Sequence, residues 1–134
     1  MNRRVLLFTD TLTDNCVSCR YFCVHGGLSP LAETLDDIQE LDRFREPGDE
    51  DGDAVFDLLW SDPNENFSQD ADVEDFDRNS DRGSGTFKYS YKAVTDFLSK
   101  NNLHSIVRAH EAQSQGFKLH TAEGEKREKE GKKE

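Results

Sequence analysis

The chain has 134 residues, of which 34% are hydrophobic, and a formal net charge of −11 at pH 7. This length allows one domain at most, and the composition lies toward the disordered side of the globular range without reaching it. Because the phosphates of nucleic acids and of anionic membranes repel so acidic a protein, we expect neither as a partner. No apolar run approaches the length of a transmembrane helix.

Residues 1–19 show no regular hydrophobic period and are expected to form a poorly ordered leader. The apolar core of this segment, residues 5–8, is too short for a secretory signal peptide. Cys16, Cys19 and Cys23 lie close together, but no second cysteine pair or suitably spaced histidine pair completes a zinc site. We therefore predict reduced thiols and a cytoplasmic protein, with Cys23 as a small buried residue of the first strand.

The first predicted strand covers residues 20–25 and ends in a histidine that two glycines follow. A histidine at the end of a strand is held rigidly. Gly26 and Gly27 are expected to let the backbone turn sharply and to keep bulk away from the ring of His25. A fixed neutral imidazole beside open space is typical of a metal ligand. The alternative is a histidine with only a structural role in the turn.

A helix is predicted over residues 35–43, because Thr34 is a suitable cap and two aspartates follow in the positive first turn. Residues 47–53 form an acidic, glycine-containing segment, for which a solvated surface loop is the favoured interpretation. A calcium site is the alternative, since carboxylates are hard oxygen ligands, but their spacing does not meet the EF-hand pattern. The apolar residues 54–60 are expected in the core, and Pro63 ends this run.

Residues 64–78 are polar and acid-rich, with Phe67 and Phe76 as the expected anchors. Ser90 predicts a helix that continues to about residue 100 and packs one apolar face on the core. A strand is expected over residues 105–109, with residues 116–119 as its hairpin partner. The charged residues 121–134 cannot bury apolar surface and are expected to be a disordered tail.

Three further residues have side chains suited to chemistry. Arg82 lies in the turn-prone run Asp-Arg-Gly, His110 follows the apolar pair 106–107, and Asp62 ends the run Leu-Leu-Trp-Ser-Asp before Pro63. Two strand-end histidines and a loop arginine suit a metal-assisted phosphate site, because imidazoles bind the metal and a guanidinium holds phosphate oxygens. Taken singly, each has a structural alternative as a strand-end histidine, a solvated turn arginine or a turn aspartate.

These motifs, in this order, resemble the serine/threonine phosphoprotein phosphatases, and most closely the calcineurin branch of that family. The stretches typical of this branch are residues 34–38 with 41–44, residues 89–98 and residues 101–113. The resemblance covers residues 21–119. It implies an α/β (α+β) fold class, in which residues 20–120 form an incomplete part of a calcineurin-like metallophosphatase β-sandwich flanked by helices.

The resemblance also implies a chemistry and partners. Members of the family use two divalent metal ions (manganese, iron or zinc) to activate a water that attacks phosphorus directly. By motif, His25 and His110 would ligate the same metal ion, Arg82 would bind the phosphate, and Asp62 would support the site indirectly. The implied partners are a phosphoprotein substrate and a phosphatase regulatory subunit.

Three segments of the family do not occur in this sequence, namely Asp-x-His-Gly, Gly-Asp-x-Val-Asp-Arg-Gly and Gly-Asn-His-Glu. They carry the other metal ligands, so the resemblance implies at most one incomplete metal site. We expect this truncated chain to lack activity by itself and to be marginally stable, because half a sandwich leaves apolar faces and sheet edges uncovered.

Three interpretations stay open. The chain is a serine/threonine phosphatase by family, or it is a non-catalytic remnant that acts as a decoy or interaction module. The third and weaker interpretation is a small metal-binding protein that uses Cys16, Cys19 and His25.

Overall fold

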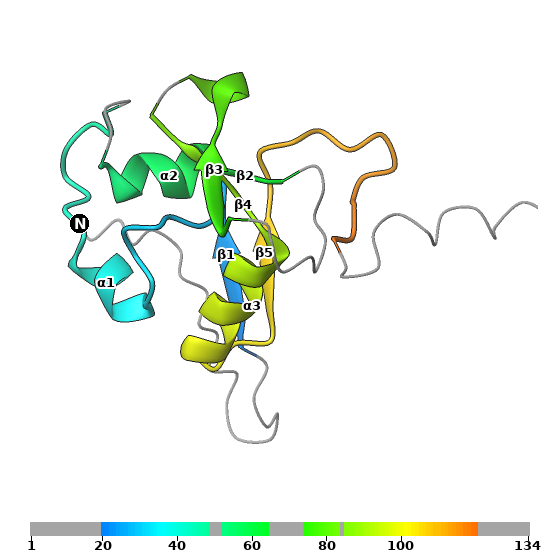
Figure 1. Ribbon diagram of the computed structural model, residues 1–134, viewed down its shortest axis with the longest axis horizontal. Helices are drawn as coiled ribbons and strands as arrows, with labels where there is room; N and C mark the ends of the chain where they lie inside the picture. The colour runs from blue at the N-terminus through cyan, green and yellow to red at the C-terminus, as the bar shows by residue number, and fades with distance from the viewer. Residues whose placement is uncertain (1–19, 49–51, 65–73, 84, 121–134) are drawn as a thin grey trace, which may run out of the picture.

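The computed structural model describes residues 20–48, 52–64, 74–83 and 85–120 (Figure 1). The predicted leader and tail lie outside these residues. The elements in chain order are β1 (Tyr21–Val24), α1 (Leu35–Glu40), α2 (Ala54–Trp60), β2 (Asp62–Pro63), β3 (Phe76–Arg78), the 3-10 turn Ser80–Arg82, β4 (Phe87–Tyr89), α3 (Tyr91–Lys100) and β5 (Ser105–Arg108). Among the helices described here, none has the length and apolar character needed to span a bilayer.

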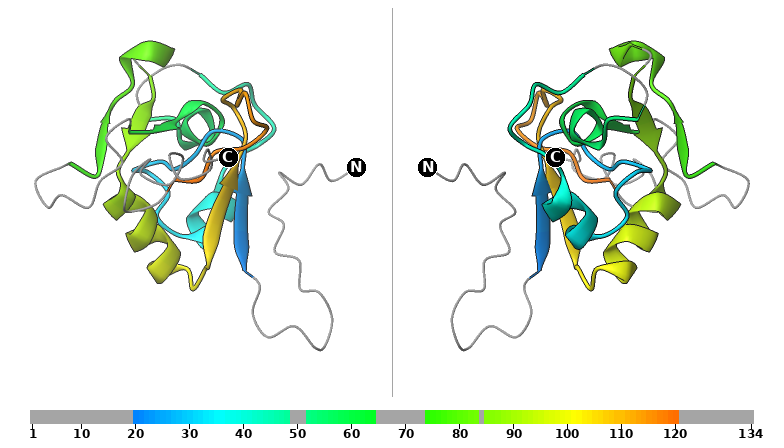
Figure 2. Two further views of the ribbon diagram at one scale, coloured as in Figure 1. Left: turned by 90° about the vertical axis from the view of Figure 1, so that its right-hand side faces the viewer. Right: turned by 90° about the vertical axis from the view of Figure 1, so that its left-hand side faces the viewer.

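Strands β1 and β5 pair in parallel and lie side by side in both views of Figure 2. Val24 at the end of β1 is opposite Arg108 at the end of β5. Because parallel neighbours end at the same edge of a sheet, the segments after both strands leave it together. The backbone N–H of Ala109 donates to the carbonyl of His25 over 3.2 Å.

The predicted hairpin between β5 and residues 116–119 is wrong. Residues 116–119 form no strand, and the side chains of Phe117 and Leu119 are 71% and 76% exposed. The hairpin was predicted because residues 116–119 follow β5 closely in the sequence. In the structure, β5 pairs instead with β1, an apolar strand near the start of the described residues. That pairing adds to the core, since Phe22 of β1 is buried against Phe97 of α3 with ring centroids 5.0 Å apart.

A second sheet has the order β2–β4–β3, with β2 parallel and β3 antiparallel to β4. Its strands have two or three residues, which is too short for an alternating pattern to be recognised in the sequence. Pro63 fits here because β2 is an edge strand. This sheet fixes Asp62 in a buried position beside Lys88 of β4.

Helix α1 begins as predicted at Thr34 but is shorter than predicted. The hydroxyl of Thr34 accepts from the N–H of Asp37 over 3.1 Å, and the carboxylate of Asp37 accepts from the N–H of Thr34 over 2.8 Å. This reciprocal pair is a capping box. The helix ends at Glu40 instead of residue 43, because Leu41 is extended with ψ 134° and the Asp42 carboxylate bonds the N–H of Phe44.

Helix α2 is capped by Asp53, whose carboxylate accepts from the N–H of Val55 over 2.9 Å. Both terminal nitrogens of Arg45 donate to the same carboxylate over 2.7 Å. The arginine and the helix N-terminus therefore already satisfy Asp53, which counts against the calcium alternative at this residue. Residues 49–51 lie outside the described part of the chain.

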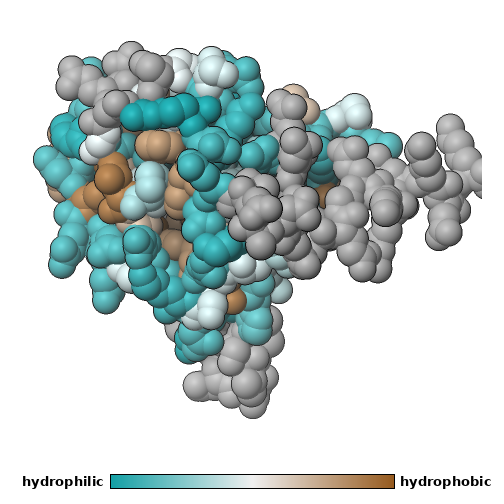
Figure 3. Space-filling model, in the orientation of Figure 1, coloured by the Kyte–Doolittle hydropathy of each residue, from teal (hydrophilic) through white to brown (hydrophobic). Residues whose placement is uncertain are grey.

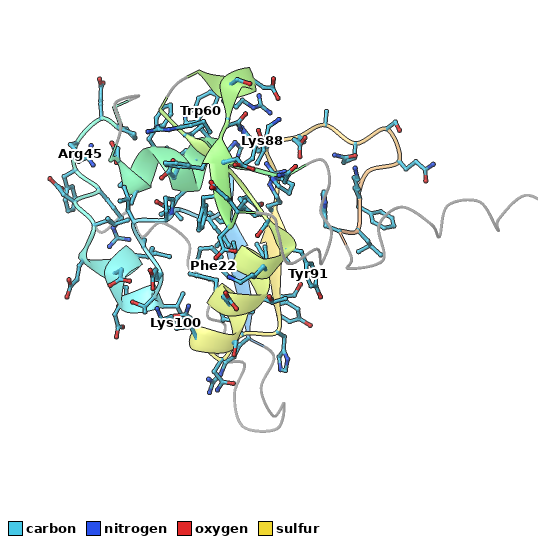
Figure 4. All side chains as sticks on the ribbon, viewed as in Figure 1. Phe22, Arg45, Trp60, Lys88, Tyr91 and Lys100 are labelled. Atoms are coloured by element: carbon cyan, nitrogen blue, oxygen red, sulfur yellow. The ribbon has the colours of Figure 1, made fainter. Side chains whose placement is uncertain are left out.

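The prediction that all of residues 54–60 lie in the core is wrong in part. The run is helical, so one side of α2 faces the core and the other faces outward. Leu58 is 8% exposed, whereas Trp60 is 41% exposed at the C-terminal end of the helix (labelled in Figure 4).

Helix α3 confirms the predicted cap, because the Ser90 hydroxyl accepts from the N–H of Ala93 over 3.1 Å. Phe76 packs against the core as predicted, and Phe67 lies outside the described residues. Cys23 was predicted to be buried but is only half-buried. The core consists of Phe22, Leu28, Ala32, Ile38, Ala54, Leu58, Tyr89, Ala93 and Phe97. The face shown in Figure 3 is mainly hydrophilic, with hydrophobic side chains visible in its middle and at the left.

Candidate metal and phosphate site

The two histidines that the sequence singled out meet at the carboxyl edge of the β1–β5 sheet. His25 follows β1 directly, and His110 comes two residues after β5. Nδ1 of His110 lies 3.1 Å from Nε2 of His25, and the two rings are 4.9 Å apart at 71°. The parallel register of the strands therefore brings together two imidazoles from distant parts of the sequence.

The glycines after His25 serve close packing. A Cβ atom on Gly26 would lie 2.5 Å from the backbone of Leu59, and one on Gly27 would lie 2.1 Å from the ring of Tyr89. The chain bends at His25 and Gly26, as predicted, but neither glycine has a positive φ, so the bend does not require the left-handed conformation that favours glycine. The N–H of Gly26 donates to the carbonyl of Leu58 over 2.9 Å, which fixes the end of β1 on helix α2.

His110 is held in an unusual conformation. Its φ is +66°, a left-handed value that non-glycine residues rarely adopt. The Trp60 ring contacts it edge-on with centroids 5.2 Å apart. Burial lowers the pKa of His110, and the positive charge of Arg82 lowers it further. The His110 ring is therefore held neutral, as a metal ligand must be.

The facing nitrogens fit one metal ion. Two ligands about 2.1 Å from a tetrahedral ion are about 3.4 Å from each other, close to the 3.1 Å that separates His25 and His110. Nε2 of His110 is buried and has no partner among the described residues. A neutral ring with its proton at Nε2 leaves Nδ1 free to bind the ion. Within the described ranges, no group of three or more His, Cys, Asp and Glu side chains is arranged to hold a metal.

Asp62 lies between two arginines. Its Oδ2 accepts from Nε of Arg82 over 2.9 Å and from the amide of Asn79 over 3.0 Å, and its Oδ1 accepts from Arg108 over 2.8 Å. Burial by itself raises the pKa of Asp62, but these hydrogen bonds together outweigh burial and hold the pKa below its ordinary value. Asp62 is thus an ionised anchor for two guanidinium groups.

Arg82 ends the 3-10 turn that follows β3. Asn79 caps this turn by accepting from the N–H of Asp81, and Gly83 after it has a φ of +95°. The side chain of Arg82 is 31% exposed, so its guanidinium is held by Asp62 on one side and is reachable from solvent. This is the arrangement that an arginine needs in order to bind an anion.

Sequence reasoning missed Arg108 and Asn79. Arg108 bonds the carbonyl of Gly26 over 2.6 Å as well as Asp62, and Asn79 is completely buried. Arg108 lies two residues before His110 in the same motif, and that position was the only available signal. Cys23 takes no part in these contacts, and Cys16 and Cys19 lie outside the described residues.

Comparison with known proteins identifies relatives. The family model of calcineurin-like phosphoesterases matches residues 2–114. The chain is 41% identical over 108 residues to the serine/threonine-protein phosphatase 2B catalytic subunit A1 of Saccharomyces cerevisiae, covering 75% of this chain and 19% of the relative. It is 38% identical over 128 residues to the PP2A-like phosphatase PPG1 of the same yeast, covering 89% of this chain and 34% of PPG1.

A solved structure agrees with these relatives. A Saccharomyces cerevisiae protein serine/threonine phosphatase with similarity to human PP5 matches with a TM-score of 0.54 and 32% identity. The match covers 69% of this chain and 26% of that structure. The chain thus spans about a fifth to about a third of the length of these relatives. The predicted metallophosphatase fold class is confirmed, and the chain belongs to the calcineurin-like phosphoesterase family.

Proposed function

We propose that this chain supplies part of the active site of a protein serine/threonine phosphatase. The observation that carries the proposal is the facing pair of imidazole nitrogens, 3.1 Å apart, beside an arginine that Asp62 holds in place. The two features are close enough for the charge of Arg82 to affect the pKa of His110. The proposed metal ligands and the proposed phosphate-binding group are thus within electrostatic range of each other.

Each residue has a distinct role in this proposal. His25 and His110 hold one divalent cation (manganese, iron or zinc) through Nε2 and Nδ1. Arg82 binds a phosphate oxygen, and Asp62 orients Arg82 without touching the substrate. When bound, such a cation lowers the pKa of a coordinated water and polarises phosphate oxygens. The proposed substrates are phosphoserine and phosphothreonine side chains of a phosphoprotein, and a phosphatase regulatory subunit is the proposed partner.

The chain by itself is proposed to be inactive. Two imidazoles leave half of the coordination positions of a tetrahedral cation open, and no third ligand joins them within the described residues. Water activation and general-acid catalysis are each worth orders of magnitude in rate. The family relationship supports the proposed reaction class, and the proposed pair of ligands predicts weak binding of one cation.

The first experiment measures hydrolysis of a phosphoserine peptide by the purified 134-residue chain with added Mn²⁺. The Arg82→Ala variant is the control for contaminating phosphatases. We expect no turnover above that of the variant. Turnover that disappears in Arg82→Ala would mean that the chain assembles a working site, and our account of the open ligand positions would be wrong.

A second experiment tests the metal site without activity. Isothermal titration with Zn²⁺ is expected to detect one binding event in the wild-type chain and to lose it in the double variant His25→Ala/His110→Ala. A Cys23→Ser variant is the matched control, because Cys23 on β1 has a free thiol that could also bind Zn²⁺. Equal binding by the double variant and the wild type would contradict the site.

A second candidate function is a non-catalytic decoy or interaction module. It is favoured by the incomplete ligand set, because no third His, Cys, Asp or Glu side chain joins the two imidazoles within the described residues. The two candidates differ in the hydrolysis assay, and a chain that binds Zn²⁺ and phosphate without turnover would fit the module.

A further inference from the structure

Arg108 is the most extensively bonded side chain near the site. Its Nε donates to the carbonyl of Gly26 over 2.6 Å, and its Nη2 donates to Oδ1 of Asp62 over 2.8 Å and to the carbonyl of Ser61 over 3.4 Å. Its Nη1 pairs with the carboxylate of Glu111. The side chain is only 12% exposed, so these protein acceptors occupy it.

The partners of Arg108 belong to the three parts of the candidate site. Gly26 directly follows the metal-binding His25, and Glu111 directly follows His110. Asp62 is the carboxylate that holds Arg82. One guanidinium therefore connects both imidazole segments to the phosphate-binding arginine. Because a guanidinium is planar and its donors point in fixed directions, this connection constrains direction as well as distance.

We propose that Arg108 is a positioning residue that sets the geometry of Arg82 relative to the His25–His110 pair. This inference rests on the proposed function. Arg108 acts through Asp62: it occupies Oδ1 and leaves Oδ2 for Arg82 and Asn79. Without Arg108, Oδ1 is free, the carboxylate rotates, and Arg82 has no single preferred direction. The carbonyl of Gly26 loses its Nε donor at the same time.

A merely structural role is the alternative. A buried arginine that joins β5 to β1 and β2 stabilises the fold whatever the site does. Loss of stability therefore does not distinguish the two roles, but the direction of the Arg82 side chain does. Arg45 offers a matched control, because it makes a bidentate pair with Asp53 away from the site.

The deciding measurement is NMR of the Arg82 Nε–H group in the full chain without metal. Its exchange with solvent is expected to be slowed in the wild type and in Arg45→Gln, and to speed up by about tenfold in Arg108→Gln. Arg108→Lys is expected not to restore protection, because one ammonium group cannot replace the fork that reaches Gly26 and Asp62 together. Unchanged protection in Arg108→Gln would overturn the proposal.

Inorganic phosphate binding in the presence of Zn²⁺ gives a second readout. Arg108→Gln and Arg82→Ala are each expected to weaken binding by about tenfold, and the double variant is expected to be no weaker than either, since both act through Arg82. Additive losses in the double variant would contradict positioning through Arg82. If the wild type binds neither Zn²⁺ nor phosphate, the proposed function fails, while the exchange measurement still decides whether Arg108 positions Arg82.

If Arg108→Gln does not fold, the exchange measurement is made on Arg108→Lys and Glu111→Gln instead. Both variants are measured at a temperature at which their circular dichroism spectra match that of the wild type. Glu111→Gln removes one charged partner of Arg108 and leaves the bonds to Gly26 and Asp62 in place. We expect protection of Arg82 Nε–H to be kept in Glu111→Gln and lost in Arg108→Lys. Equal protection in both variants would overturn the proposal.

Discussion

His25 and His110 face each other with ring nitrogens 3.1 Å apart, although 85 positions separate them in the sequence. The parallel pairing of β1 with β5 produces this meeting, because both histidines follow strands that end at the same edge. The arrangement brings two potential ligands to one point before any metal ion binds.

A divalent cation is therefore expected to stabilise the folded chain. A ligand that binds the folded state alone raises its stability in proportion to the logarithm of the ligand concentration. Thermal unfolding monitored by circular dichroism should show a melting temperature that rises with Zn²⁺ in the wild type. The same titration of His110→Ala should leave the melting temperature unchanged, and an equal rise in both proteins would place the binding elsewhere.

Replacing Gly27 by alanine is expected to destabilise the fold by about 1–3 kcal/mol. The new Cβ atom would lie 2.1 Å from the Tyr89 ring, which is itself buried. Urea unfolding of Gly27→Ala measures the loss. A double variant that adds Tyr89→Leu should recover part of it, because the smaller side chain makes room; strictly additive losses would mean that the contact with Tyr89 is not the cause.

Asp57→Asn is expected to raise the free energy of unfolding at neutral pH by about 1 kcal/mol. Asp57 is 1% exposed, its Oδ2 accepts from the Ser29 hydroxyl over 2.6 Å, and its Oδ1 has no partner among the described residues. Burial raises the pKa of Asp57, and the hydrogen bond from Ser29 offsets this only in part. The ionised form is therefore unfavourable in the folded state.

The raised pKa of Asp57 makes the stability of the folded chain depend on pH. A carboxyl group with a raised pKa in the folded state binds more protons there than in the unfolded chain, so stability falls as pH rises from the unfolded pKa through the folded one. Urea unfolding between about pH 4 and 7 should show a smaller fall in Asp57→Asn than in the wild type. Parallel curves for the two proteins would contradict the assignment.

Asp62→Asn is expected to cost about 3 kcal/mol of stability, because it removes the buried carboxylate that pairs with the mostly buried guanidinium of Arg108 and leaves only the more exposed Glu111. Arg82→Ala should cost less than about 1 kcal/mol of stability, since the side chain of Arg82 is more exposed than that of Arg108.

The lowered pKa of Asp62 means that its contribution to stability is present above the pKa of the unfolded chain and is lost as pH falls through the pKa of the folded chain. Acid unfolding should therefore show the full difference between Asp62→Asn and the wild type above about pH 4 and a shrinking difference as the pH falls below it; a constant difference at all pH values would count against this ion pair.

Some of the fold could be predicted because the responsible interactions are local. Thr34 and Ser90 cap their helices through bonds to the third residue along the chain, and such pairs are visible as short sequence patterns. The end of α1 was misjudged because Asp42 bonds the N–H of Phe44 and the chain turns there. A side-chain choice of this kind competes with the helix and leaves no clear pattern.

The candidate site was predicted only in part, because many of its contacts join residues that are far apart along the chain. His25, His110, Asp62 and Arg82 were singled out by residue type and motif, and their functional roles stay predictions. The turn at the glycine pair after His25 was predicted, but the close approach of Leu59 and Tyr89 was not, because those residues come from distant segments. Arg108 was passed over, since its partners Gly26 and Asp62 lie far from it along the chain.

The sequence by itself determined the acidic character, the helix caps and the family, because composition, capping and ordered motifs are properties of the chain. Only the tertiary structure decided that β5 pairs with β1 and not with residues 116–119, and that one carboxylate holds two arginines. The physical reason is that strand pairing and buried ion pairs depend on which surfaces pack together, such as Phe22 against Phe97. The meeting of His25 and His110 follows from that packing.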